Sequence, residues 1–345
     1  MGTKRVSQKD IAERLGVHVT TVSMALRDSP RLPVKTRKRV QAMAKKMGYQ
    51  PDPILNALMV YRQRMRSPHF QGTLAWLNID KRDGAPPGRG SAEYQAGAAE
   101  RCKELGWQLS EFRIEDTSPD RLAKILHSRN IQGLLLPPPQ PGGISHLDFD
   151  WAPFSALSIG FTMTHPRLHL VANAQYRSAR QAVRAIRSLG YERIGFATIP
   201  GNELRTNQNF SSGYLAQERS DKQAGPPLFI FDDTGKSGRK KFISLFSKWI
   251  DRHRPDAILA LDDDVPGAMK TLGISSKTCG LALLHVTPKT KGMAGISQND
   301  FMIGSSAVDY LVGMIHRNER GLPDIPLQIL VDGTWVDGAS LPQRA

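Results

Sequence analysis

The sequence contains few of the features that mark secreted or membrane proteins. Its 345 residues include only two cysteines, Cys102 and Cys279, which lie far apart and fit no metal-binding spacing. We therefore expect both thiols to be reduced and packed in the interior. No run of eighteen apolar residues suggests a transmembrane helix, and the first residues lack the apolar segment of a secretory signal. These absences predict a cytoplasmic protein.

Patterns that indicate catalysis or metal binding are also weak. The run Asp262-Asp263-Asp264 would bind a cation only if a loop folded its carboxylates toward one ion. Gly235-Lys236-Ser237 lacks the glycine, five residues earlier, that a phosphate-binding P-loop requires. No nucleophile, base and orienting group form a recognisable set. We therefore expect no enzymatic activity, no cofactor and no metal site.

The basic residues are concentrated at one end of the chain. Residues 1–66 contain fifteen Lys or Arg against four acidic residues, a net charge of +11, whereas the whole chain carries +15. A solvated surface usually mixes both signs. A basic head on a nearly balanced remainder is instead typical of a nucleic-acid-binding module joined to another domain. The length agrees, because it predicts two or three domains.

Residues 7–26 predict two short helices joined by a tight turn. Ser7 and Asp10 fit a capping box, and Gly16 fits the left-handed residue that ends a helix. The apolar side chains of both helices fall on inward faces, at Ile11, Ala12, Leu15, Val22, Ala25 and Leu26. The second helix has small residues on its outer side, as the reading helix of a helix-turn-helix does. For this pattern alone, a surface helical hairpin with no role in DNA binding is the alternative.

Residues 33–47 predict a third helix that ends at Gly48. Its apolar face packs onto the first two helices and closes an all-α head of three helices; it consists of Val40, Met43, Ala44 and Met47.

The stretch from Lys9 to Pro51 resembles, without a gap, the head of LacI/GalR-type bacterial transcription regulators. The sequence V-T-T-V-S and the later Gly48-Tyr49-Gln50-Pro51 carry this resemblance. It implies a sequence-specific, nucleoid-associated regulator, typically a repressor, that binds a palindromic operator as a homodimer. A lone reading helix rarely binds tightly, which also favours two-fold pairing. Because no heptads follow at the C-terminus, we do not expect a tetramer through a coiled coil.

The resemblance also implies which residues of the head contact double-stranded operator DNA. Aligning V-T-T-V-S assigns the base contacts to Val19, Thr20 and Met24. Contacts to the DNA backbone are assigned to Ser7, His18, Thr21, Ser23, Arg27, Arg31, Lys35, Thr36 and Tyr49. Pro33 stands where the family usually has Ser, so the third helix lacks a hydroxyl cap.

Residues 51–69 are expected to form a hinge helix and linker. In the family the corresponding segment folds on the operator, and apolar wedges of this kind unstack a base step in the minor groove. The hinge contacts are therefore assigned to Leu55, Asn56 and Leu58. A linker helix buried against the next domain is the alternative.

From residue 70 onward, predicted strands alternate with helices, which favours parallel sheets with right-handed crossovers. The strands are expected at 72–80, 107–114, 133–139, 154–161, 193–199, 227–231, 256–264 and 279–284. Two such sets resemble the two-lobed, periplasmic-binding-protein-like (type I) α/β body of the same family over residues 70–345. We expect lobe 1 at about 70–170 and 301–325, and lobe 2 at about 171–300 and 326–345. The stretch LQILVDGTWV is expected as one strand that crosses back between lobes.

A small-molecule effector is expected in the cleft between lobes, because ligands of parallel sheets lie beyond the carboxyl ends of the strands. The candidate residues are Asn78, Asp80, Phe161, Phe210, Asp262, Asp263, His285 and Gln298. Phe210 replaces the Arg of sugar-binding members, and Ala174-Gln175 replaces their Asp-Asn. The effector is thus a sugar or related metabolite, or the pocket is redesigned or holds none. The other function classes are a cytosolic small-molecule-binding protein and an α/β enzyme without a DNA role.

Overall fold

The structure is a computed structural model that divides near residue 70 into two compact units, the head and the body. It describes residues 6–26, 32–49, 70–79, 90–114, 118–139, 146–223, 225–231, 238–261 and 264–344. The predicted hinge at 51–69 lies outside these ranges, and so do the predicted contacts Arg27, Arg31, Leu55, Asn56, Leu58, Asp80, Asp262 and Asp263.

The head contains the three predicted helices: α1 (Gln8–Leu15), α2 (Val19–Leu26) and α3 (Val34–Lys46). The capping box at the start of α1 is confirmed, since the backbone N–H of Ser7 donates to Asp10 Oδ2 and that of Asp10 to Ser7 Oγ. Gly16 ends α1 with φ 65°, the left-handed conformation that favours glycine. The local signals of the sequence therefore suffice to place the turn before α2.

One small hydrophobic core holds the head together. Its buried residues come from all three helices and are Ile11, Ala12, Leu15, Val22, Ala25, Val40 and Ala44. Two side chains of α3 also bind the carboxyl ends of the other helices: Arg39 donates to the Leu15 carbonyl and Gln41 to the Ala25 carbonyl. These bonds satisfy carbonyl groups that have no partner within their own helix.

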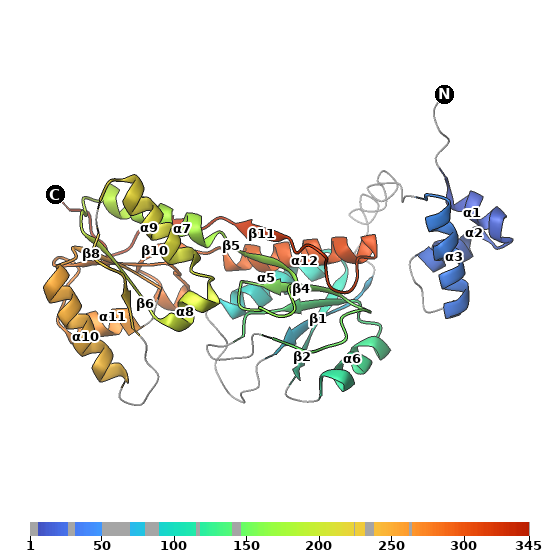
Figure 1. Cartoon of the computed structure of the whole chain (residues 1–345), viewed down its shortest axis with the longest axis horizontal. Coiled ribbons are helices and arrows are strands. Elements are labelled where there is room, and N and C mark those ends of the chain that lie inside the picture. The colour runs from blue at the N-terminus through green and yellow to red at the C-terminus, as the bar shows by residue number, and fades with distance from the viewer. Residues whose placement is uncertain are drawn as a thin grey trace, which may run out of the picture. The chain divides into compact units, whose positions relative to one another are not determined.

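The body contains two six-stranded sheets (Figure 1). The first sheet, in the order β11-β5-β4-β3-β1-β2, is parallel throughout. Its strands are β1 (Gly72–Asn78), β2 (Trp107–Arg113), β3 (Gly133–Leu136), β4 (Ser155–Ile159), β5 (His169–Asn173) and β11 (Gln328–Val331). The second sheet has the order β12-β10-β9-β8-β6-β7, and β12 runs antiparallel at its edge. Its strands are β6 (Ile194–Thr198), β7 (Phe229–Ile230), β8 (Ala257–Ala260), β9 (Gly280–Leu283), β10 (Ala294–Ser297) and β12 (Thr334–Val336).

Helices cover both faces of each sheet, which explains why most of the strands are continuous apolar runs. The helices are α5 (Ser91–Glu104), α6 (Pro119–Ser128), α7 (Gln175–Ser188), α8 (Pro200–Arg205), α9 (Asn209–Ser220), α10 (Gly238–His253), α11 (Asp264–Thr271) and α12 (Asp300–Arg317), with a short 3-10 helix η2 (Pro288–Thr290). On the first sheet, α5 and α12 pack on one face and α6 on the other; on the second, α7 and α9 lie opposite α10 and α11. We call the first sheet with its helices the first lobe, and the second sheet with its helices the second lobe. Within the described ranges, no helix has the length and apolar character needed to span a bilayer.

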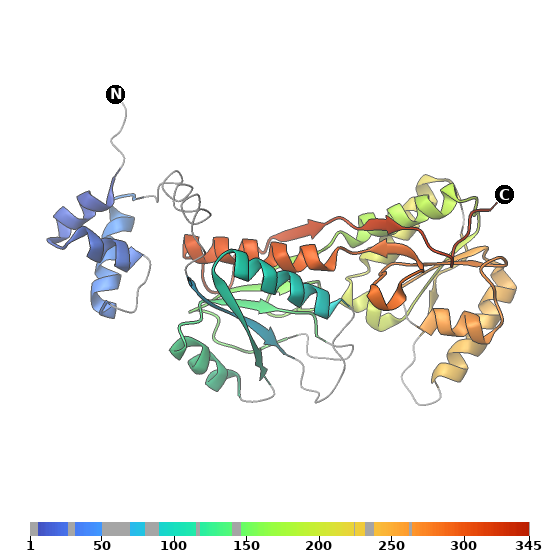
Figure 2. The same ribbon diagram turned by 180° about the vertical axis from the view of Figure 1, so that it is seen from behind.

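The helices α5 and α12 lie side by side at very close range (Figure 2). A Cβ atom added at Gly97 would lie 2.0 Å from the Phe301 carbonyl oxygen, and one added at Gly304 would lie 2.0 Å from the Tyr94 carbonyl oxygen. Ser305 Oγ donates to the Gly97 carbonyl at 3.1 Å. Two glycines thus permit backbone contact and attach the start of α12 firmly to the first lobe.

The structure corrects the predicted boundaries of the lobes. The boundary at 170 falls inside β5, which belongs to the first sheet, and LQILVDGTWV forms two strands rather than one. β11 pairs with β5, and the chain then passes through Gly333 into β12, which pairs with β10. A Cβ atom at Gly333 would lie 2.5 Å from Ile296 Cγ2, so glycine lets the chain cross at this point. Residues 328–331 accordingly belong to the first lobe, whereas they were expected in the second.

Asn173 joins the three segments that cross between the lobes. Its side chain is 2% exposed. Its amide donates to the carbonyl groups of Gln298 and Val331, at 3.4 and 3.1 Å, and its carbonyl oxygen accepts from Ser178 Oγ at 2.9 Å. A single buried amide therefore ties the ends of β5, β10 and β11 together.

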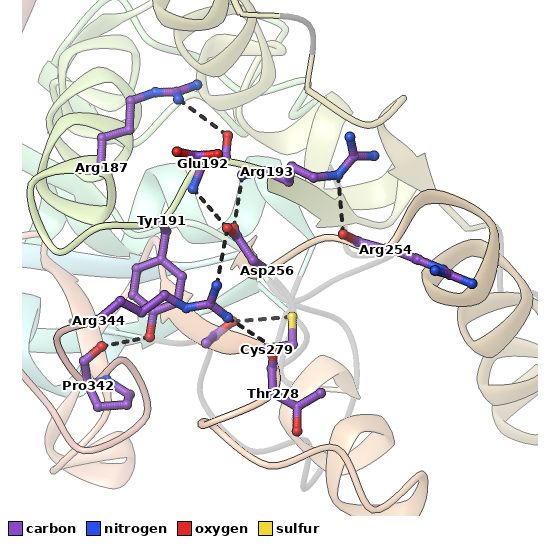
Figure 3. Close-up of polar contacts among 11 residues, drawn as sticks. Arg187, Tyr191, Glu192, Arg193, Arg254, Asp256, Thr278, Cys279, Pro342 and Arg344 are labelled. Atoms are coloured by element: carbon purple, nitrogen blue, oxygen red, sulfur yellow. Dashed lines mark hydrogen bonds and ion pairs between the residues drawn. The ribbon is translucent and has the colours of Figure 1, made fainter.

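The C-terminal segment closes the second lobe (Figure 3). Asp256 accepts hydrogen bonds from the backbone N–H groups of Glu192 and Arg193, both at 2.9 Å, and pairs with Arg344 at 3.4 Å. The guanidinium of Arg344 also lies 4.6 Å from the centre of the Tyr191 ring. Leu341 is buried in the core beneath α7. The last residues of the chain are thus part of the second lobe rather than a tail.

Candidate functional site

The outer surface of α2 carries the residues predicted to contact bases. Val22 and Ala25 are fully buried against the head core. Val19 is 38% exposed, Thr20 is exposed and Met24 is half-buried. The three predicted base contacts therefore lie on the side of the helix that the core leaves accessible.

His18 caps the start of α2. Its carbonyl accepts from the backbone N–H groups of Thr21 and Val22, at 2.9 and 3.2 Å. Its side chain lies over the first turn, where the backbone N–H of Thr20 donates to Nδ1 at 3.3 Å and Thr20 Oγ1 lies 2.8 Å from the same nitrogen. Caps of this kind usually use Ser, Thr, Asp or Asn. Here an imidazole supplies the acceptor.

Within the described part of the head, the other residues predicted to contact the DNA backbone differ in exposure and in the hydrogen bonds that they already make. Lys35 is exposed at the start of α3, where Pro33 provides no side-chain cap, as expected. The Ser7 hydroxyl and backbone N–H both donate to Asp10 Oδ2 at 2.7 Å, so a phosphate would have to displace that carboxylate. Three others are half-buried: Thr21, Ser23 and Thr36. The hydroxyl of Tyr49 accepts from Gln8 at 3.0 Å.

Four of the predicted effector residues lie at or just beyond the carboxyl ends of strands. Asn78 ends β1 and Phe161 follows β4 in the first lobe, whereas His285 follows β9 and Gln298 follows β10 in the second. Gln298 is 5% exposed, and its amide donates to the Leu284 carbonyl at 2.9 Å. Gln298 therefore holds the ends of β9 and β10 together.

A buried polar contact joins the lobes next to these strand ends. His285 Nε2 lies 2.7 Å from Asp300 Oδ2, and both side chains are at most 7% exposed. The hydroxyl of Tyr94 also interacts with Asp300. Burial and then the charge and hydrogen bond of Asp300 raise the pKa of Tyr94 well above its usual range. Because α12 is packed on the first lobe, the His285–Asp300 contact bridges the two lobes.

Gly90 closes this cluster from the first lobe. It precedes α5 with φ 76°, and a Cβ atom there would lie 3.0 Å from both Asp300 Cγ and His285 Cε1. The sequence indicated His285 but missed Asp300 and Tyr94. The position of Asp300 in the first turn of a helix, two residues after Gln298, was the only signal for it.

The expectation that Phe210 contacts an effector is wrong for this structure. Phe210 is fully buried in the second-lobe core, with Phe196 and Tyr214, because its aromatic ring lies on the inward face of α9. The polar group nearby on the same helix is Ser211, whose hydroxyl makes a short hydrogen bond of 2.5 Å to the buried Glu203. No Arg occupies the place of the clamping residue.

A cavity of about 410 Å³ lies elsewhere on the first lobe. It is lined by Asp120, Ala123, Lys124, His127, Asp150 and Pro153. None of the predicted effector residues lines it. Among the described residues, no group of three His, Cys, Asp or Glu side chains is arranged to hold a metal ion.

Comparison with known proteins agrees with this arrangement. Residues 7–52 match the family model described as bacterial regulatory proteins, lacI family. The HTH-type transcriptional regulator DegA of Bacillus subtilis (strain 168) is 22% identical over 263 residues, which cover 74% of this chain and 72% of DegA.

Solved structures of regulators share the fold of the whole chain. A lac repressor dimer bound to operator and the anti-inducer ONPF is 15% identical, with a TM-score of 0.58, 98% of this chain covered and 100% of that chain. A complex of the transcriptional regulator CelR with cellobiose is 17% identical, with a TM-score of 0.55, 97% of this chain covered and 100% of that chain. Residues 7–52 thus match the lacI family of bacterial regulatory proteins, and the chain has the fold of these solved regulators.

Proposed function

We propose that this protein is a LacI-family transcriptional repressor that binds a palindromic operator as a homodimer, and that a small molecule bound between its lobes changes its DNA affinity. The observation that carries the DNA-binding half is the outer face of α2. Val19, Thr20 and Met24 lie there on a helix whose opposite face is anchored in the core. A reading helix needs this combination of accessible side chains and rigid support.

Met24 makes the base readout unusual. The family usually has Arg at this position, and an Arg pairs with O6 and N7 of guanine, whereas Met24 has no donor. We therefore propose that the half-site does not depend on guanine at the base facing Met24, and that apolar contacts to thymine methyl groups contribute there.

Selection of bound sequences from a random DNA pool tests this readout. Wild type and Met24→Arg would be selected in parallel, and Met24→Arg is expected to gain a guanine preference worth roughly 1–3 kcal/mol. Identical base preferences at every position would show that Met24 does not face a base. The selected sites would also reveal whether the operator is palindromic.

The dimer is tested by light scattering of the full chain at micromolar concentration, with and without the selected operator. Two half-sites related by two-fold symmetry require two heads, so a dimer is expected on the DNA. A monomer under both conditions would contradict the proposal.

The effector half of the proposal rests on the strand ends that meet at His285 and Asp300. Because this contact bridges the lobes, a ligand that binds beside it would favour one arrangement of the lobes over another. CelR was solved with cellobiose and the lac repressor with ONPF, but Phe210 is buried here, so the chemistry of this site differs from an Arg-clamped sugar site.

A panel of mono- and disaccharides, added to the operator complex, tests this half. An effector is expected to change operator affinity by roughly 5- to 150-fold. His285→Gln should weaken the response, whereas His127→Gln, in the separate cavity beside α6, should not. No response to any sugar would reject the carbohydrate class, and equal responses in both variants would reject the site.

A further inference from the structure

The contact between His18 and Thr20 determines which groups Thr20 can present to DNA. Both the backbone nitrogen and the hydroxyl oxygen of Thr20 lie within hydrogen-bond distance of His18 Nδ1, at 3.3 and 2.8 Å. Thr20 occupies the first turn of α2, and its side chain is exposed. The Thr20 side chain thus contacts His18 and also lies on the outer face of α2, which is the proposed DNA-binding surface.

The direction of these hydrogen bonds follows from the chemistry of the groups. A backbone N–H can only donate, so Nδ1 must accept, and it therefore carries no proton. This tautomer has its ring N–H at Nε2. The Thr20 hydroxyl faces the same unprotonated nitrogen at the shorter distance, so its hydrogen is donated to Nδ1. Only the lone pairs and the methyl group of Thr20 remain for a base.

Base edges in the major groove respond differently to such a side chain. Cytosine presents the N4 amino group and adenine the N6 amino group as donors, whereas guanine presents only the acceptors N7 and O6. A hydroxyl that acts as an acceptor can bind these amino groups, but it repels the acceptors N7 and O6 of guanine. An unconstrained hydroxyl could rotate and donate to guanine instead.

We propose that His18 is a specificity-determining positioning residue, which takes the hydroxyl hydrogen of Thr20 and thereby selects adenine or cytosine over guanine at the base facing Thr20. This inference rests on the proposed role of α2 as the reading helix. It adds a second role to the contact with the DNA backbone that is expected of His18. The residue that caps the helix would then also influence which base the helix recognises.

Two substitutions separate the cap from the readout. His18→Gly removes the acceptor, although glycine at an N-cap costs a helix only a few tenths of a kcal/mol. His18→Asn keeps a side-chain oxygen that can accept at the same place and caps well. We expect His18→Gly to fold and to lose the discrimination, and His18→Asn to fold and to retain it.

The experiment is selection from a random DNA pool with the full chain carrying wild type, His18→Gly, His18→Asn, Thr20→Val and the double substitution His18→Gly/Thr20→Val. Wild type and His18→Asn should deplete guanine at one position of each half-site. His18→Gly should raise guanine there on the order of tenfold, since a good base contact discriminates by about that much. In the Thr20→Val background, His18→Gly should change nothing, because the hydroxyl is absent.

Nitrogen NMR of the imidazole of His18 gives an independent readout, with the proton expected on Nε2. A proton on Nδ1, or a guanine frequency that His18→Gly leaves unchanged while wild type still enriches a defined site, would overturn this inference alone. Failure of wild type to enrich any sequence would overturn the proposed function and this inference with it.

Discussion

The head and the body of this chain are stabilised in different ways. The head depends on one cluster of seven buried residues drawn from a short stretch of the chain, and the side-chain caps at the starts of α1 and α2 join residues three or fewer apart. The body has four buried clusters, and its decisive polar contacts join residues far apart in sequence, such as Asn173 with Val331 and Asp256 with Arg344. Local contacts support the proposed DNA-binding surface, and contacts between distant residues support the proposed effector site.

Because of this difference, we expect the head and the body to unfold independently. A core as small as that of the head rarely supplies more than about 3–5 kcal/mol, whereas the larger body is closed by contacts that span the chain. Substitutions that destabilise only one part should therefore leave the unfolding transition of the other part unchanged.

The largest effect is expected for Ile11→Ala. Ile11 is fully buried at the centre of the head core, and such truncations cost roughly 2–5 kcal/mol. That loss is comparable with the whole stability of the head, so specific DNA binding should disappear. Calorimetry should show the transition of the body unchanged. Lys9→Ala, which removes a salt bridge at 4.0 Å between exposed side chains, is the matched control. If Ile11→Ala also lowered the transition of the body, the two parts would not be independent.

The two cysteines report on the lobes separately. Cys102 lies in the first-lobe core and Cys279 in the second-lobe core, and burial raises the pKa of each thiol to about 12. At pH 8 this lowers the reactive thiolate about a thousandfold relative to an exposed cysteine. A thiol reagent should therefore label neither residue in the native protein and both in urea.

The pH dependence has a definite sign. The native state holds both thiols protonated, whereas the unfolded chain releases these protons above its ordinary thiol pKa of about 8.5. Their contribution to stability is thus complete below that pH and declines as pH rises toward 12. Rapid labelling of one cysteine at pH 8, with the other protected, would show that its lobe opens alone.

A smaller effect is expected for Gly304→Ala, because a methyl group there would lie 2.0 Å from the Tyr94 carbonyl oxygen. The helices α5 and α12 would have to separate, at a cost of about 1–3 kcal/mol. The transition of the body should fall while isolated half-site binding by the head persists. Gly201→Ala is the control, since an added Cβ meets nothing within 4 Å there. Equal behaviour of both variants would contradict the close packing.

The smallest effect is expected for Lys35→Ala, which leaves both parts folded. Lys35 is exposed at the start of α3, and the loss of one phosphate contact should reduce the slope of log affinity against log salt by about 0.9. Specific and random DNA should weaken alike. Lys270→Ala, on α11 of the body, should leave the slope unchanged. An unchanged slope for Lys35→Ala would remove this residue from the interface.

The sequence predicted the head well because its signals are local. Ser7 with Asp10, and Gly16, specify their own conformations through neighbours in the chain, and all three are confirmed. In the body, alternation predicted two parallel sheets but missed β5 and β10, because their sequences, HLVAN and AGIS, mix polar or small residues into short runs and lack the continuous apolar character of the predicted strands.

The candidate effector site was only partly predictable. Strand ends identified His285 and Gln298, since that inference needs only the order of elements. The partner of His285 is Asp300, which begins a helix packed on the other lobe, and no local pattern reveals such pairing. Phe210 was misassigned because its place in a motif was considered without its inward position on α9.

The closure of the second lobe by Arg344 has a consequence for how the protein is made. The three helices of the head are complete once residue 46 has been synthesised, so the head can fold while the rest of the chain is still on the ribosome. The first sheet, by contrast, is incomplete until β11 at residues 328–331 has been synthesised. The second lobe is incomplete until β12, Leu341 and Arg344 have been synthesised. A nascent chain that stops short of these residues would therefore carry a folded head and two incomplete sheets.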